Sequence, residues 1–274
     1  MKLQRLFIPL IIVLFANTTL AQSFFDRDSV FNNPRLYFSA GSYHPTMTTS
    51  LRLDSEIGLG TIISLEDDIK LAEELSAFRI DGTIRVKKRS QFMLAYTTLR
   101  RDRELVLDKD IDFKDTTFYI DASVRAYFDI NYFALSWRYS LLDKPNWNAG
   151  FSVGLRIVQI KTGLQAQLNS KSYSEDVKLN APALLVGIHG GAYLLPRLLG
   201  RYSLEYFQVS IADLKIIVIE NRFSMEYFVF KNVGVGAGYE VNAYRIKEIP
   251  LSDNFKGKVN LGFGGFNLFL SARF

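Results

Sequence analysis

Two histidines are the side chains in this sequence best suited to acid–base chemistry. His189 lies within Gly187-Ile188-His189-Gly190-Gly191, and His44 precedes Pro45. A hydrolase or acyl transferase would need one of them beside a Ser or a similar nucleophile. Neither histidine lies in a His-x-Ser arrangement, and a hydrogen-bonded structural role explains His189 better. The sequence therefore assigns no catalytic residue, and we predict that the chain is not an enzyme.

Metal-binding side chains are scarce. The sequence has no Cys and only two His. The thiolate and imidazole ligands that zinc, haem or iron–sulfur centres need are therefore largely missing. Asp108, Asp110 and Asp112 have the spacing of a calcium loop, but the Gly and the terminal Glu of such a loop are absent. We therefore predict neither a metal site nor a cofactor.

The acidic run Glu66-Asp67-Asp68 has a structural explanation. It follows Ser64 in the order that is typical of an N-terminal capping box. Apolar residues then recur at helical spacing between Leu65 and Leu75. We expect a short amphipathic helix here, rather than a cation site.

The elements that must position these residues are strands. From Arg35 onward the sequence alternates with period two and is rich in Phe, Tyr, Val and Ile, which indicates strands. The predicted strands are 35–46, 77–87, 91–103, 118–142, 147–168, 179–194, 199–211, 213–230, 233–247 and 256–274. With 48% hydrophobic residues and 14% aromatics, the composition fits one ordered domain.

The predicted connections alternate in length. Short ones lie at 88–90, 143–146, 196–197 and 231–232, and longer polar ones at 47–76, 104–117, 169–178 and 248–255. Strands 199–211 and 213–230 depart from this pattern, since a short connection joins them at the loop end. Short periplasmic turns opposite long extracellular loops are typical of a bacterial outer-membrane barrel. We predict an all-β, antiparallel transmembrane β-barrel of about ten strands, with eight or twelve as alternatives.

The N-terminus has the features of a signal peptide. Lys2 and Arg5 precede an apolar run from Leu6 to Phe15, and Thr19-Leu20-Ala21 fits a cleavage site. The run is too short for a membrane-spanning helix. We therefore expect residues 1–21 to be a signal peptide, 22–34 a periplasmic N-terminal segment, and 35–274 the barrel.

Several predicted strands change their apolar face partway along. From Trp147 to Ile157 the odd-numbered residues are apolar, whereas beyond Val158 the even-numbered ones are. Successive side chains of a strand point to opposite faces. A switch of the apolar residues from odd to even positions therefore means either a β-bulge or a change in what surrounds the strand at that height. Bulges at one height in six strands would be a coincidence. We expect a periplasmic half facing lipid and an outer half in water; a soluble lipocalin-like barrel would keep one apolar face.

The same parity predicts what lines the lumen. Charged residues of both signs point inward at membrane level and should pair, closing a bore of this width. These residues are Arg138, Arg156, Arg201, Glu205, Arg222, Glu226 and Glu240. In the outer half the inward set is apolar and forms either a packed plug or a pocket for a hydrophobic ligand. Its candidate members are Phe207, Val209, Ile216, Val218, Tyr244, Ile246, Leu261 and Phe263.

The last strand carries the most specific signal. Alternate residues from Phe266 to Phe274 are apolar, and the chain ends on Phe274. This strand, and the segment 41–46 that leads into the first loop, resemble small outer-membrane barrels of the OmpW and OmpA type. The resemblance implies that Phe274 is part of the signal read by the barrel-assembly machinery. The OmpW type usually has eight strands and an apolar channel proposed to pass small hydrophobic molecules, so ten strands would be a departure.

These features limit the partners. Lys and Arg exceed Asp and Glu by only five residues, 33 against 28, and are spread along the chain, which argues against a nucleic-acid partner. We expect outer-membrane lipid and lipopolysaccharide as neighbours, with Arg100, Arg101, Arg103, Lys256 and Lys258 placed to meet lipopolysaccharide phosphates or simply solvated. The barrel either binds or passes a small hydrophobic ligand, or is a non-transporting structural or surface-interaction protein. A lipid-modifying enzyme is the further alternative.

Overall fold

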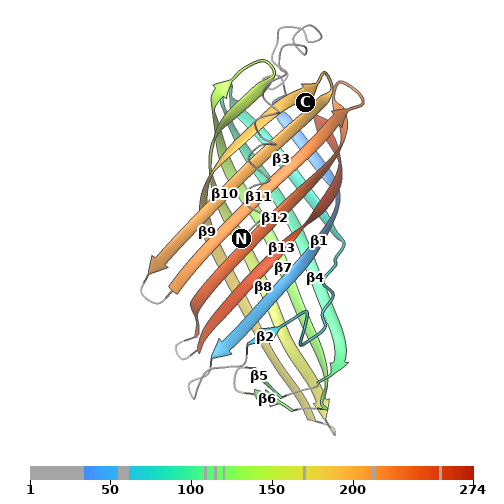
Figure 1. The fold of residues 1–274 in the computed structure, drawn as a ribbon, viewed down its shortest axis with the longest axis vertical. Coiled ribbons are helices and arrows are strands. Elements are labelled where there is room, and N and C mark those ends of the chain that lie inside the picture. Colours follow the sequence, from blue (N-terminus) through green and yellow to red (C-terminus); the bar gives the residue numbers. More distant parts are fainter. Residues whose placement is uncertain are drawn as a thin grey trace, which may run out of the picture.

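The computed structural model describes residues 34–54, 62–107, 110–113, 116–119, 121–168, 171–211, 214–252 and 255–274. Ten long strands form a barrel, shown in Figure 1. They are β1 (Leu36–Asp54), β3 (Ala77–Lys87), β4 (Ser90–Val106), β7 (Ser123–Asp143), β8 (Trp147–Leu168), β9 (Lys171–Leu195), β10 (Leu198–Ile211), β11 (Leu214–Phe228), β12 (Val233–Ser252) and β13 (Phe255–Arg273). Three short strands complete the set: β2 (Ile63–Ser64), β5 (Ile111–Phe113) and β6 (Thr116–Phe118).

The barrel closes by pairing its first and last strands. β1 and β13 are antiparallel in unbroken register from Tyr37 opposite Arg273 to Asp54 opposite Lys256. Phe274 and Leu36 exchange two backbone hydrogen bonds at 2.8 and 3.0 Å, so both ends of the barrel chain meet. The prediction of a closed antiparallel barrel with ten strands is confirmed.

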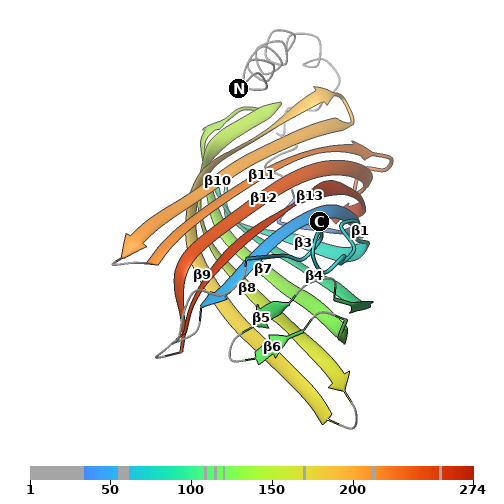
Figure 2. The same ribbon diagram turned by 60° about the horizontal axis from the view of Figure 1, so that its bottom comes forward.

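At the end opposite the short turns, the barrel is extended mainly by its long strands and less by loops. β9 begins at Lys171 and β12 runs to Ser252, so the predicted loops at 169–178 and 248–255 are wrong over most of their length. β9 spans 25 residues, roughly 80 Å at ~3.3 Å per residue, although about 9–11 residues cross a membrane. Figure 2 shows the outer ends of β8 and β9 extending past the hairpin end of β10 and β11.

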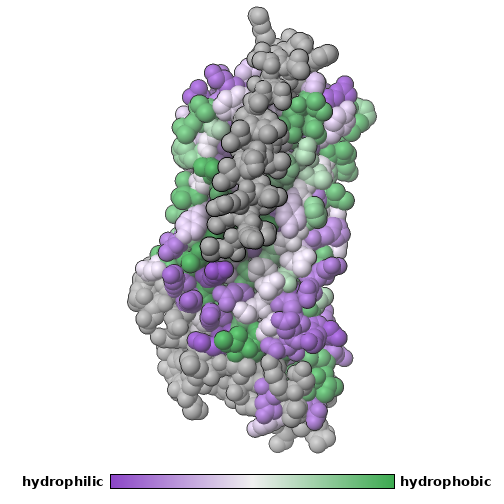
Figure 3. Space-filling model, in the orientation of Figure 1, coloured by the Kyte–Doolittle hydropathy of each residue, from purple (hydrophilic) through white to green (hydrophobic). Residues whose placement is uncertain are grey.

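The switch of the apolar face along the strands reflects a change in what surrounds them, and not a β-bulge. Val241 on β12 is 47% exposed, whereas Tyr244 is 3% exposed. The ladder between β12 and β13 continues through both residues without a shift. β8 and β9 likewise pair unbroken from Trp147 to Leu168. The apolar band in Figure 3 lies toward the end with the short turns, and hydrophilic side chains gather toward the other end. This band faces the membrane.

The predicted helix in the first loop is absent. Ser64 makes the expected capping contacts, accepting a bond from the Asp67 amide at 3.1 Å, but only one turn forms. Lys70 has φ 55°, a left-handed conformation that ends a helix. Residues 63–75 instead run beside β1, as the Leu65 amide donates to the Thr49 carbonyl and the Leu75 amide to the Pro45 carbonyl. The segment extends the wall next to β3, which is short.

Some predictions fall outside the described residues. The expected signal peptide and residues 22–33 lie there, as does Asp108. Within the described ranges, no helix has both the length and the apolar character to span a membrane.

Candidate functional site

Arg156 organises the polar cluster at the outer end of the membrane-level lumen. Its side chain on β8 is 1% exposed, and its Nε donates to Oε2 of Glu220 on β11 at 2.8 Å. It also forms an ion pair with Glu205 on β10. Ser152 and Ser136 donate hydroxyl hydrogen bonds to Glu205 at 2.8 and 3.3 Å. We call these five residues the Arg156 cluster.

Two tyrosines extend the Arg156 cluster across the bore. Tyr132 on β7 donates to Glu220 at 3.0 Å, and Tyr244 on β12 donates to the same carboxylate. β7 and β11 are separated by three other strands in the sheet order, so these bonds cross the lumen. The cluster therefore ties opposite walls together.

Two glycines make room for the Arg156 cluster. A Cβ on Gly154 would lie 2.6 Å from the guanidinium of Arg156 and from the hydroxyl of Ser136. A Cβ on Gly187 would lie 2.6 Å from Cγ of Glu205. Larger residues at either position would push the ion pair apart.

A ring of four charges lies nearer the turns. Arg79 on β3 bonds to Asp81 at 2.9 Å and to Glu240 on β12 at 2.8 Å. Arg222 on β11 bonds to the same two carboxylates at 2.9 and 3.1 Å. Two cations and two anions balance in this ring, which we call the Arg79 ring. Such shared, charge-assisted bonds fix the geometry of all four groups.

A third group lies closest to the turns. Arg201 on β10 forms an ion pair with Glu226 on β11, and its guanidinium sits 4.6 Å from the ring centre of Tyr37 on β1. Glu226 also accepts a bond from Ser271. The lumen at membrane level thus holds three stacked polar groups.

The structure brings together six of the seven predicted lumen charges in pairs. These are Arg156 with Glu205, Arg201 with Glu226, and Arg222 with Glu240. The Arg138 side chain forms no direct ion pair or hydrogen bond with any described residue, and its Nε is buried.

Among the charged residues and tyrosines of the Arg156 cluster and the Arg79 ring, sequence reasoning missed four: Arg79, Asp81, Glu220 and Tyr132. Parity could have found three of them. Arg79 and Asp81 share a face with Arg85, and Glu220 follows Ile216 and Val218 at period two. Tyr132 has the parity of the inward outer-half residues of β7, but nothing local shows which partner it reaches across the bore.

Seven of the eight candidate pocket residues lie in or against a packed apolar core in the outer half. Val218, Tyr244, Ile246, Leu261 and Phe263 are buried there, and Phe207 and Ile216 pack against them. The rings of Tyr244 and Phe263 stack with centres 5.9 Å apart, and Tyr132 meets Phe263 edge-on at 6.4 Å. Val209 is half-buried.

Arg101 was expected at the surface, where it could meet lipopolysaccharide, and this expectation is wrong. Because it shares the inward face of β4 with Leu99, it is 3% exposed and does not meet lipopolysaccharide. It forms an ion pair with Glu66, donates to the Thr49 hydroxyl at 2.8 Å, and lies 4.9 Å above the Phe128 ring. Burial lowers the pKa of its guanidinium, and the bond to Glu66 opposes that shift. Arg101 thus fastens the 63–75 segment inside the barrel.

The described residues contain no assembled catalytic or metal centre. His189 lies on β9 facing the lumen, and neither of its ring nitrogens has a hydrogen-bond partner among them. The hydrogen-bonded role expected for His189 stays a prediction, with the Phe151 backbone as a polar neighbour of the ring. Within the same ranges, no three His, Asp or Glu side chains are grouped to hold a metal ion.

Comparisons with known proteins bear on the fold. No protein-family model and no curated protein matches the sequence. The crystal structure of outer membrane protease OmpT from Escherichia coli is similar with a TM-score of 0.54 and 10% identity, over 87% of this chain and 97% of that one. OprG from Pseudomonas aeruginosa gives 0.35 and 7%, over 89% and 98%. The chain has the fold of bacterial outer-membrane β-barrels, and its place is the outer membrane.

Proposed function

We propose that the chain is a non-transporting structural or surface-interaction protein of the outer membrane, with a lumen closed at two levels. The observation that carries the proposal is the Arg156 cluster, which joins β7, β8, β10, β11 and β12 across the bore. The Arg79 ring lies on its periplasmic side, and the apolar core lies on its outer side. Ions would have to break paired charges and then cross a packed apolar layer.

The packing of the outer half favours this proposal over a carrier of hydrophobic ligands. A cavity of about 150 Å³ lies at the turn end, and one of about 10 Å³ lies beside the Arg156 cluster. None of the eight candidate pocket residues lines either cavity. An acyl chain would therefore have to displace the stacked rings of Tyr244 and Phe263. A lipid-modifying enzyme has less support, since no described Ser is hydrogen-bonded to His189.

The long outer strands support a role at the cell surface. The wall made of β7, β8 and β9 extends far toward the end opposite the short turns (Figure 1). Strands that extend this far are unnecessary for crossing the membrane, and they carry the outer ends of β8 and β9 to a distance from it. We infer that this projecting wall meets lipopolysaccharide or surface partners.

We expect planar-bilayer recordings of the folded protein to show no steady conductance. An Arg156→Ser variant should stay closed as well, because the apolar core remains in place. A porin inserted into the same bilayers is the control for the assay, and heat-modifiable migration in gels checks that both forms are folded. Porin-like steps in the wild-type protein would disprove the closed lumen.

We propose further that the barrel-assembly machinery reads Phe274. Its side chain is 68% exposed, so it is free to be recognised. A Phe274→Ser variant retains the backbone hydrogen bonds to Leu36, so any effect comes from the loss of the aromatic side chain. We expect several-fold less assembled protein in the outer membrane, measured as the heat-modifiable fraction, while refolding of the purified variant in detergent stays normal. Equal loss in both assays would mean that Phe274 acts only in stability.

A further inference from the structure

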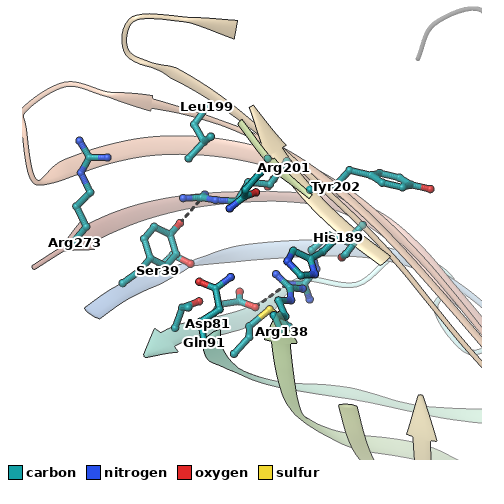
Figure 4. A pocket seen from close by; sticks show the side chains of 18 of the residues that line it. Ser39, Asp81, Gln91, Arg138, His189, Leu199, Arg201, Tyr202 and Arg273 are labelled. Carbon is teal, nitrogen blue, oxygen red and sulfur yellow. Dashed lines mark hydrogen bonds and ion pairs between the residues drawn. The ribbon is translucent and has the colours of Figure 1, made fainter. Parts of the chain in front are cut away.

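The cavity at the turn end of the lumen is strongly cationic. It has a volume of about 150 Å³, roughly ten times what one water molecule needs. Its lining comes from strands around the bore, including Ser39 of β1, Asp81 of β3 and Arg138 of β7 (Figure 4). Asp81 is the one acidic residue in its lining, against six arginines. These arginines are Arg35, Arg85, Arg138, Arg201, Arg222 and Arg273.

Two of these arginines form no direct ion pair among the described residues. Arg201 and Arg222 are neutralised by the polar groups above. Arg273 instead donates to the Tyr193 hydroxyl at 2.9 Å and to the Lys231 carbonyl at 2.8 Å, and both acceptors are neutral. The Arg138 side chain donates no hydrogen bond to a described residue, and its buried Nε lacks an acceptor, although two carboxylates attract its charge without direct contact. The cavity therefore carries positive charge that no direct ion pair neutralises.

His189 adds an unsatisfied polar group at the same place. It lines the cavity, is 6% exposed, and has both ring nitrogens without partners in the described ranges. Leaving buried polar atoms without partners is unfavourable, so such groups usually mark a ligand or an ordered water. Figure 4 shows the imidazole beside Arg138.

Two glycines follow His189 on β9 and border the same space. Gly190 and Gly191 both line the cavity and bring no side chain into it. Ser203, across from His189 on β10, also lines the cavity and offers a hydroxyl donor.

We propose that this cavity binds a phosphate-type oxyanion from the periplasmic side, held by Arg138 and His189. A guanidinium matches two oxygens of such an anion with parallel N–H bonds. A neutral imidazole donates one further N–H bond. Asp81 and Arg222 of the Arg79 ring line the cavity, whereas no member of the Arg156 cluster does. The site therefore does not depend on closure of the lumen by the Arg156 cluster.

The test uses the two histidines as reporters. With ¹⁵N-labelled histidine, the folded protein in zwitterionic detergent has ring signals from His44 and His189 alone. Titration with inorganic phosphate should shift the His189 signals saturably and leave those of His44 unchanged, whereas chloride at equal ionic strength should not. A saturable shift seen only after phosphatidylglycerol is added to the micelles would assign the oxyanion to a lipid headgroup. No shift with either source would overturn the proposal.

Variants test the same site by calorimetry. Arg138→Gln should weaken phosphate binding at least tenfold, and His189→Phe should weaken it several-fold. Lys144→Gln, which removes an exposed charge from a periplasmic turn outside the cavity, should leave the affinity unchanged. Equal affinity in folded Arg138→Gln and wild-type protein would refute the assignment. The NMR titration of the wild type decides the matter if the variants fail to fold.

Discussion

An Arg156→Met variant is expected to lose about 3–5 kcal/mol of unfolding free energy. The substitution keeps much of the side-chain volume but leaves Glu205 and Glu220 in the lumen without their shared cation, and both are nearly inaccessible to solvent. Uncompensated buried charge is more costly than the lost attraction itself. Urea unfolding in lipid vesicles, followed by the fluorescence of the two tryptophans, measures the change.

A matched triple variant separates charge from packing. Arg156→Met combined with Glu205→Gln and Glu220→Gln removes the unpaired anions while keeping their shape. We expect it to recover a substantial part of the lost stability. If the single variant unfolds within about 1 kcal/mol of wild type, Arg156 does not hold the lumen together.

A Val186→Arg variant is expected to lose about 2–4 kcal/mol, because Val186 points outward from β9 in the apolar band. Asn180→Arg is the control, since Asn180 lies six residues away on the same strand with the same outward parity but in the outer half. It should change stability by less than about 1 kcal/mol. The same assay compares both.

Comparable losses in the two variants would contradict the assignment of the outer half to water. Loss in Asn180→Arg alone would reverse the orientation of the apolar band along β9. The pair therefore tests the height of the membrane boundary directly.

Much of the architecture follows from the sequence because strands alternate with period two. This rule predicted ten strands, the closing strand that ends at Phe274, and the change of apolar face between Val241 and Tyr244. Alternation is a property of each strand by itself, so it can be recognised in the sequence without knowing which strands lie beside it. Strand ends were less certain: β9 and β12 continue through polar residues that the sequence suggested were loops.

Helical spacing between Leu65 and Leu75 was misleading for a tertiary reason. The Ser64 cap formed, yet contacts of this segment with β1 and the bond from Arg101 to Glu66 outweighed a short helix with weak intrinsic stability. Apolar side chains at helical spacing serve equally well to fill the inside of a barrel.

Parity determined which side chains enter the lumen, whereas only the closed barrel decided which ones meet. Arg156 and Glu220 are 64 residues apart and lie on strands that are not neighbours. Their contact depends on strand number, stagger and the space left by Gly154, which no local pattern encodes. Arg138 has the same parity and charge as Arg156, yet the tertiary structure places its side chain at a cavity beside His189, where it makes no direct ion pair among the described residues.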